Sequence, residues 1–392
     1  MVTVLNATLL SLAIIFQLGH VTGLRAEPYI PQNDSVVLEQ LSTTSNPQIQ
    51  KLRKLRTQLS NNPNDLTLAT RLARAYIQLG RTNADPRYDG YAQAALTPWW
   101  NLSHAPTNVL ILRATLRQRR HDFDRALQDL DRVLQQQPRH AQAWLTQAVI
   151  QTVRGHYHEA RRSCLLLRRF TNTLGSTTCL THVMGLNGHA QESYHSLQTA
   201  IENRTASSEE TLWTLTILAE MAMRLGNTSE AEHYFQDALA INQHDTYLLG
   251  AYSDFLLDQN RPAEALDLLE TTIRPDGLLL RLALAEQELH TPTLQQHIET
   301  LKARFAANRL RGDARHLREE SRFTLHLLHK PKHALNLALE NWRIQREPWD
   351  ARIVLEAALQ SGDSIAAQPI VDWLTSKNVE DVELTNLMEK AS

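Results

Sequence analysis

Hydrophobic and polar positions between residues 141 and 174 follow a pattern that recurs along most of the chain. Apolar residues lie three and four positions apart on both sides of Gly155, as they do on one face of an α-helix. Gly155 and its polar neighbours interrupt this periodicity, which is typical of a turn. The segment therefore predicts two amphipathic helices joined by a short turn. Its apolar and small residues occupy defined positions of the unit, namely Trp144 at position 4, Ala148 at 8, Tyr157 at 17, Ala160 at 20, Cys164 at 24 and Leu167 at 27.

The same pattern returns when the sequence is shifted by 34 residues. Residues 107–140 form such a unit directly before residue 141, and further units begin at residues 212, 246 and 348. Alanine occupies position 20 in the units that begin at 107, 141, 212 and 246, where two paired helices must approach each other closely. The repetition predicts an all-α chain built from stacked helical hairpins.

This spacing resembles the tetratricopeptide repeat, a helical hairpin of about 34 residues. The resemblance covers roughly residues 64–374, although Gln147 and Ala148 replace the Leu and Gly of the repeat signature. It implies an α-solenoid, a right-handed superhelix of about nine hairpins in which each repeat is stabilised by its neighbours. We expect this solenoid over residues 48–377 and a polar capping helix over 378–392.

In such proteins the first helix of each hairpin lines a concave groove, which implies a non-catalytic scaffold that binds a protein or peptide. The lining mixes apolar, aromatic and charged groups and lacks the Lys and Asn set typical of a clamp for C-terminal carboxylates. Trp213 and Tyr247 are candidate anchors for a peptide or helix, although Trp213 could equally pack between repeats. The groove positions of the well-phased units are Asn108, Arg119, Gln142, Leu145, Trp213, Glu220, Arg224, Tyr247 and Asp254.

The N-terminal segment resembles a secretory signal. The first 24 residues carry no Asp, Glu, Lys or Arg, and Leu9 to Leu18 is almost continuously apolar. We therefore expect a signal peptide over residues 1–26, a flexible polar tether over 27–47, and a periplasmic or secreted protein of bacterial type. An uncleaved membrane anchor is the alternative, because an uncharged segment of this length could span a bilayer.

The chain has two cysteines, Cys164 and Cys179. Cys164 lies on the second predicted helix of one hairpin and Cys179 on the first helix of the next, at similar distances from the turn between them. If the protein is exported, a disulfide could link the two repeats. Alternatively, both residues fill small apolar positions in the core.

Charge is distributed in blocks. Residues 51–170 contain 20 Lys and Arg against 8 Asp and Glu, whereas residues 171–300 contain 5 against 18. This pattern could support head-to-tail self-association, or binding of nucleic acid or an anionic surface by a cytosolic protein through residues 51–170. Solvated helix faces are the slightly favoured explanation, and nucleic acid is the less favoured partner.

The sequence contains no phosphate-binding loop, dinucleotide-binding motif, nucleophile elbow or His-Glu-x-x-His motif. We therefore expect no enzyme activity and no cofactor. The remaining alternative is a metal-dependent enzyme, because histidines cluster in two places. Metal binding requires three or four converging ligands, which surface histidines rarely provide. The two clusters are His182, His189 and His195, and His326, His329 and His333.

Overall fold

The computed structural model describes residues 47–391, apart from residues 83–84, 172, 204–205, 271–274 and 312–315. The expected signal peptide and the expected tether up to residue 46 lie outside this range. The described residues form 21 helices and no strand, so the predicted all-α solenoid is confirmed. The chain divides into two units after Gln50, and the hairpins belong to the unit from Lys51 to Ser392.

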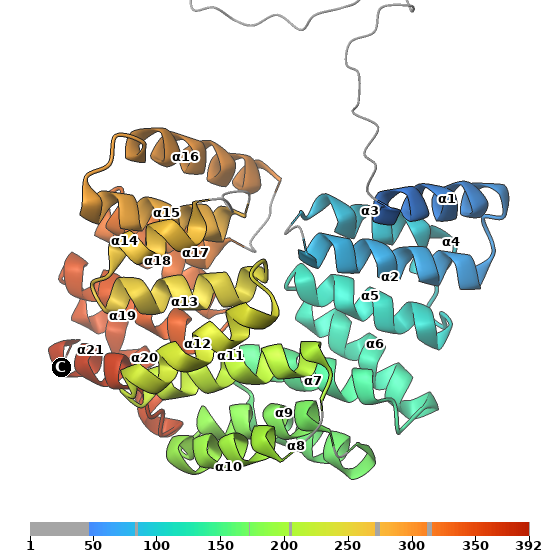
Figure 1. Cartoon of the computed structure of the whole chain (residues 1–392), viewed down its shortest axis with the longest axis horizontal. Coiled ribbons are helices and arrows are strands. Elements are labelled where there is room, and N and C mark those ends of the chain that lie inside the picture. The colour runs from blue at the N-terminus through green and yellow to red at the C-terminus, as the bar shows by residue number, and fades with distance from the viewer. Residues whose placement is uncertain are drawn as a thin grey trace, which may run out of the picture. The chain divides into compact units, whose positions relative to one another are not determined.

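Nine pairs of antiparallel neighbours make up the array in the described part of the chain (Figure 1). The N-terminal half contains α1 (Pro47–Asn61), α2 (Leu66–Thr82), α3 (Arg87–Ala95), α4 (Thr97–Trp100), α5 (Thr107–Arg119), α6 (Phe123–Gln136), α7 (Ala141–Val153), α8 (Tyr157–Phe170), α9 (Leu174–Gly185) and α10 (Ala190–Glu202). The C-terminal half contains α11 (Ser208–Arg224), α12 (Thr228–Ile241), α13 (Thr246–Asp258), α14 (Pro262–Leu269), α15 (Asp276–Leu289), α16 (Leu294–Leu310), α17 (Leu317–His326), α18 (Pro331–Trp342), α19 (Pro348–Ser361), α20 (Ser364–Ser376) and α21 (Val382–Ala391).

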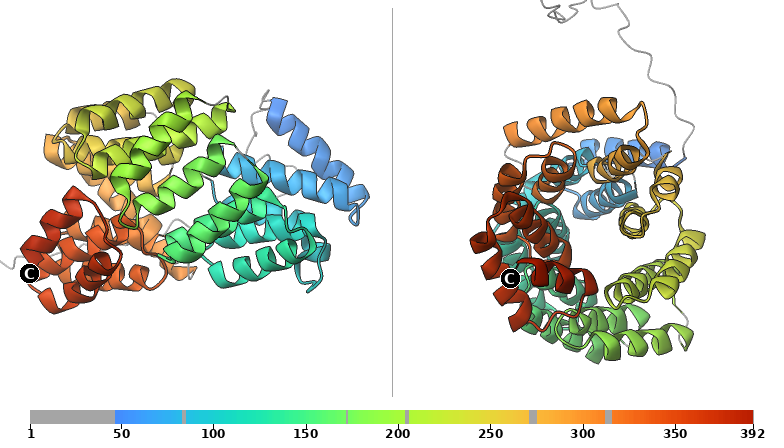
Figure 2. Two further views of the ribbon diagram at one scale, coloured as in Figure 1. Left: turned by 90° about the horizontal axis from the view of Figure 1, so that it is seen from below. Right: turned by 90° about the vertical axis from the view of Figure 1, so that its left-hand side faces the viewer.

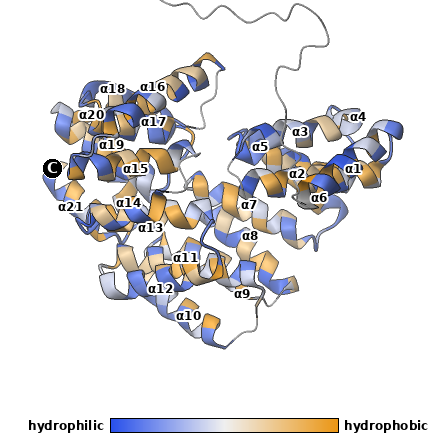
Figure 3. Ribbon diagram, turned by 45° about the horizontal axis from the view of Figure 1, so that its top comes forward, coloured by the Kyte–Doolittle hydropathy of each residue, from blue (hydrophilic) through white to orange (hydrophobic). Residues whose placement is uncertain are grey.

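Small residues at the expected positions let paired helices approach. Ala126, Ala160, Ala231 and Ala265, all at position 20 of their units, are fully buried. Hydrophobic and hydrophilic residues are mixed along each helix (Figure 3), and the buried apolar ones form several clusters that follow one another along the chain. The core is therefore distributed between neighbouring hairpins, as stacking of repeats requires.

Successive hairpins turn about a common axis, so the array curves (Figure 2). As a result, the C-terminal helices reach the turns of hairpins near the middle of the chain. The Arg346 backbone N–H donates to the Val153 carbonyl at 2.7 Å, and Trp373 lies against Gly155. The Ala190 backbone N–H donates to the Glu380 carboxylate, also at 2.7 Å, across 190 residues of sequence. We call these contacts, made by Arg346, Trp373 and Glu380, the C-terminal clasp.

Gly155 shows why the turn sequence matters for the clasp. Its φ is +71°, a conformation that costs other residues energy but is open to glycine. The glycine lies in the turn between α7 and α8, and a Cβ added there would lie 2.6 Å from Cζ2 of Trp373. Because glycine has no side chain, Gly155 can adopt the backbone conformation of the turn and also leaves room for Trp373.

Candidate binding cavity

Two cavities, each about 380 Å³, lie on the inner wall of the array. His182, Thr246, Tyr247 and Glu347 line both of them, so the cavities adjoin. Volumes in this range are typical of ligand pockets. We call the cavity that contains Arg224 the Arg224 cavity and the one that contains Trp213 the Trp213 cavity.

The first helices of three successive hairpins supply one wall of these cavities. α9 supplies His182, α11 supplies Trp213, Glu220 and Arg224, and α13 supplies Tyr247. These helices face the axis of the array, as the repeat resemblance implies for first helices. Residues far along the chain supply the other wall of the Arg224 cavity, namely Arg318, Glu347, Trp349, Arg352, Asp381 and Leu384.

Tyr247 and Glu220 form a hydrogen-bonded pair between adjacent hairpins. The Tyr247 hydroxyl donates to Oε1 of Glu220 at 2.7 Å, and the tyrosine side chain remains accessible, with the residue 57% exposed. Burial raises the pKa of the Glu220 carboxyl, while nearby Arg224 and the Tyr247 hydrogen bond oppose that rise. Tyr247 therefore offers an exposed aromatic ring with a fixed hydroxyl position.

Arg224 and His182 have polar atoms that lack partners. Arg224 is 7% exposed, and its Nε and Nη2 have no hydrogen-bond partner in the described part of the chain. Nδ1 of His182 is likewise buried without a partner among the described residues. Burial and the charge of Arg224 lower the pKa of the His182 imidazole to about 3, so this histidine is neutral at ordinary pH.

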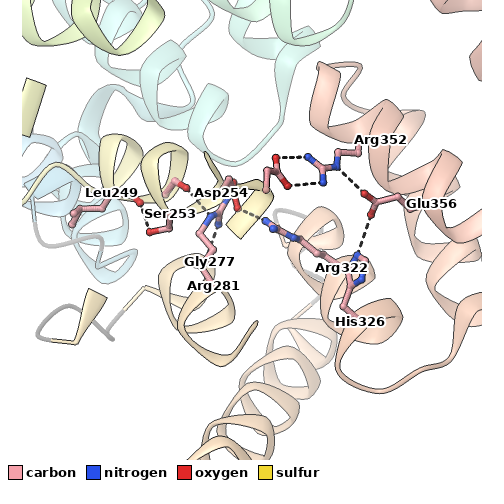
Figure 4. Close-up of polar contacts among 11 residues, drawn as sticks. Leu249, Ser253, Asp254, Gly277, Arg281, Arg322, His326, Arg352 and Glu356 are labelled. Atoms are coloured by element: carbon pink, nitrogen blue, oxygen red, sulfur yellow. Dashed lines mark hydrogen bonds and ion pairs between the residues drawn. The ribbon is translucent and has the colours of Figure 1, made fainter. Parts of the chain in front are cut away.

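Asp254 belongs to an internal ion-pair network between α13 and the C-terminal helices (Figure 4). The residue is 1% exposed, and its carboxylate accepts from Arg281 at 2.5 Å and from Arg322 at 2.6 Å. Burial alone would raise the pKa of Asp254, but the two guanidinium groups lower it. Asp254 is therefore occupied by contacts within the chain.

Arg352 continues the network toward α19. It donates to the Asp258 carboxylate at 2.7 and 2.8 Å and to Glu356 at 2.7 Å. His326 contacts the other carboxylate oxygen of Glu356 at 3.0 Å. Burial opposes ionisation of Glu356, but His326 and Arg352 lower its pKa to about 2. The network thus ties the second wall of the cavity to the first.

The predicted groove residues fall into two groups. Trp213, Glu220, Arg224, Tyr247 and Asp254 line the two cavities, and Trp213 also packs against two core clusters. The other four residues line neither cavity. Asn108 and Gln142 are exposed, Arg119 donates to Asp89, and Leu145 packs against the core.

The second wall could not be recognised in the sequence. Arg318 and Glu347 come from a weakly phased stretch. Trp349 and Arg352 belong to the unit that begins at residue 348, but no local pattern pairs them with α11 or α13. His182 carried a detectable signal, because it lies on a first helix with apolar neighbours. Its spacing groups it instead with His189 and His195, which are exposed.

The structure joins Cys164 on α8 and Cys179 on α9 by a disulfide. Within the described ranges, no group of three or more His, Cys, Asp or Glu could hold a metal ion. In that same part of the chain, no helix has the length and apolar character needed to cross a membrane.

The fold and the groove geometry define a solenoid of helical hairpins. Residues 111–172 and 222–286 each match a family model described as tetratricopeptide repeat. These two stretches are thus tetratricopeptide repeats, and there the resemblance predicted from the spacing is confirmed. No curated protein matches the sequence at a significant level.

Solved structures with a similar arrangement share little sequence with this chain. The APC/C hetero-tetramer Cut9-Hcn1 matches at 15% identity over 87% of this chain, which spans 59% of that chain, with a TM-score of 0.43. Yeast Tom70 matches at 10% identity over 88% of this chain and 85% of that one, with a TM-score of 0.41. The human IFIT1 dimer with m7Gppp-AAAA matches at 13% identity over 88% and 85%, with a TM-score of 0.47. At these values nothing about function passes from those proteins to this chain.

Proposed function

We propose that this protein is a non-catalytic scaffold that binds a segment of another protein in the Trp213 cavity. The carrying observation is the combination of an accessible aromatic ring, Tyr247, with a partly buried one, Trp213, on the inner wall of stacked repeats. Aromatic side chains in such positions contribute much of the binding free energy in protein interfaces. The apolar neighbours Val149, Val183 and Ile217 suit an aliphatic or aromatic side chain of the partner.

The ion pairs of α13 with α15, α17 and α19 restrict where such a segment can lie. A partner that ran along the whole inner wall would have to displace the contacts between α13 and the C-terminal helices. A short segment that enters the Trp213 cavity displaces none of them. We therefore propose recognition of a few residues and not of a long helix.

The uncharged, apolar N-terminal segment supports a site of action in the cell envelope. The role of the scaffold there would be assembly of an envelope complex. N-terminal sequencing of the mature protein tests the location, since an intact N-terminus on cytosolic protein would contradict export.

The basic surplus of residues 51–170 gives less support to nucleic-acid binding. Arg113 and Arg117 both donate to the buried Asp129, and Arg119 donates to Asp89. Guanidinium groups in such pairs are not free to neutralise phosphates. Part of the basic block therefore stabilises the hairpins themselves.

The scaffold proposal is tested by partner capture from envelope extract with the wild-type protein and three variants. Trp213→Ala and Tyr247→Ala remove the aromatic groups of the cavity, and both should reduce recovery of the partner at least tenfold. Ile365→Ala is the matched control, because Ile365 is 86% exposed on α20 and lines neither cavity. Equal recovery by all four proteins would show that this cavity does not bind the partner.

A further inference from the structure

Arg224 differs from the other arginines that line its cavity. Arg281 pairs with Asp254, Arg318 with Asp350 and Glu347, and Arg352 with Asp258 and Glu356. Arg224 makes no ion pair with any described residue, although it is 7% exposed. Because a buried cation without a partner is costly, such a group is expected to gain one from a ligand or water.

Glu220 offers the complementary charge one helical turn away on α11. Side chains separated by four residues on a helix lie about 5–6 Å apart at Cβ. Even so, the structure shows no hydrogen bond or ion pair between Glu220 and Arg224, both of which are described, and the Glu220 carboxylate has only the Tyr247 hydroxyl. The two side chains thus present separated negative and positive charges to one cavity.

The other residues that line the Arg224 cavity limit the kind of ligand that Glu220 and Arg224 can bind. Seven acidic residues but only four arginines line the cavity, so a ligand with several negative charges would be repelled. The apolar part of the lining includes Leu186, Met223, Leu278 and Leu384. These side chains favour a ligand with one hydrophobic group, and about 380 Å³ is enough for a small molecule.

We propose that the Arg224 cavity binds a free α-amino acid with a hydrophobic side chain, its carboxylate at Arg224 and its ammonium group at Glu220. His182 also lines this cavity, and it is neutral there because burial and the charge of Arg224 lower the pKa of its imidazole. This site is a small-molecule site, so it goes beyond the scaffold function and does not depend on it.

Titration calorimetry of the purified protein tests the assignment with leucine and phenylalanine as probes. Two analogues separate the charges: phenylalaninamide lacks the carboxylate and N-acetylphenylalanine lacks the ammonium group. We expect one of the two amino acids to bind, and each analogue of a bound probe to bind at least tenfold more weakly. No binding of either amino acid at millimolar concentration would overturn the proposal, as would equal binding of the analogues.

Variants locate the site on the same protein. Arg224→Gln should weaken amino-acid binding at least tenfold and remove the preference for the acid over the amide. Arg168→Gln is the matched control, because Arg168 is exposed on α8 and lines neither cavity. Unchanged binding by a folded Arg224→Gln protein would overturn the assignment. If that variant does not fold, the comparison of acid, amide and acetylated probe on the wild-type protein still decides the question.

Discussion

Asp254 illustrates how distant segments determine the role of a single residue. Its repeat position implied a groove contact, but in the structure two guanidinium groups enclose it, one of them from Arg322, 68 residues along the chain. A carboxylate that is buried this deeply contributes to stability through its pairing, because loss of one partner leaves the other charges buried. Asp254 is therefore a structural residue whichever ligand the neighbouring cavity binds.

Asp254→Asn should destabilise the protein by about 3–5 kcal/mol, because Arg281 and Arg322 lose their shared counter-charge. Urea unfolding followed by circular dichroism measures the effect. Asp267→Asn is the control, since Asp267 is exposed on α14, and it should change the free energy of unfolding by less than about 0.5 kcal/mol. A similar small effect for both variants would show that the network contributes little.

His182 predicts an acid-sensitive component of stability. Its imidazole takes up a proton near pH 3 in the folded protein, because burial and Arg224 lower its pKa, but near pH 6.5 when unfolded. Between these values the unfolded state binds more protons, so the free energy of unfolding falls as the pH falls. From pH 7 to 5.5 the wild type should lose about 1 kcal/mol more than His182→Gln.

Unfolding of the wild type, His182→Gln and His158→Gln at several pH values checks this difference. The His158 side chain is 88% exposed, so its replacement should leave the pH dependence of the wild type intact. Parallel curves for all three proteins would contradict the buried neutral state of His182.

At the scale of the elements, the turn between α7 and α8 requires of Gly155 both a positive φ and the absence of a side chain. Gly155 and Gly362 share a positive φ, +71° and +72°, but only Gly155 has another side chain against it. Gly362→Ala should therefore cost only the penalty of a Cβ in the left-handed region, about 1–2 kcal/mol. Gly155→Ala should cost at least about 1 kcal/mol more, because the new Cβ overlaps Trp373.

A double-mutant cycle measures how much of the cost of Gly155→Ala comes from the overlap with Trp373. In the background of Trp373→Ala, the cost of Gly155→Ala should fall toward that of Gly362→Ala, because the overlapping ring is gone and the remaining neighbour, Cβ of Arg346, lies 3.2 Å from the added Cβ. Free energies of unfolding for the four combinations provide the test. If Gly155→Ala costs the same with and without Trp373, the turn does not contact the ring in solution.

The disulfide between α8 and α9 links two hairpins across a short loop. Its sequence separation of 15 residues predicts a stabilisation of about 3 kcal/mol from restriction of the unfolded chain. Reduction, or replacement of both cysteines by alanine, should lower the free energy of unfolding by that amount. Thiol titration of denatured, unreduced protein should detect no free thiol, and two reactive thiols would show that the bridge does not form.

Sequence periodicity was sufficient to locate the hairpins but not to predict all the residues that line the cavity. Small residues at fixed spacing report contacts between paired helices, so the units at 107, 141, 212 and 246 could be located from the sequence alone. Trp213, Glu220, Arg224 and Tyr247 of the first wall followed from the same spacing, whereas His182 did not. The clasp could not be predicted from the sequence. Contacts such as that of Arg346 with Val153 depend on the curvature of the array. This curvature is the sum of small rotations between many successive repeats, which no local pattern reveals.

At the scale of the whole unit, the clasp and the ion-pair network together change how the repeats depend on one another. In a simple linear array each repeat contacts only its neighbours, so damage to the last repeat stays local. Here Asp258 and Arg352 form an ion pair across 94 residues, and Glu380 meets the backbone of Ala190. Distant repeats are therefore expected to share their stability.

Trp373→Ala should loosen the α7–α8 turn as well as α20. Hydrogen exchange read by mass spectrometry should show faster exchange of the backbone around residues 153–157, because the ring that covers this turn is lost. Ile365→Ala changes an exposed residue of the same helix and should leave residues 153–157 unaffected. Exchange confined to α20 in the tryptophan variant would indicate an ordinary linear array.

The clasp also imposes an order on biosynthesis. Ribosomes release a polypeptide from its amino end, so the early hairpins are free to stack while α17 to α21 are still missing. Helices α17 to α21 supply most of the second wall of the Arg224 cavity. They also supply Trp373, which lies against Gly155, and Arg352, which pairs with Asp258. A nascent chain therefore acquires the second wall of the Arg224 cavity only after α17 to α21 have been made, and products truncated before α17 lack that wall.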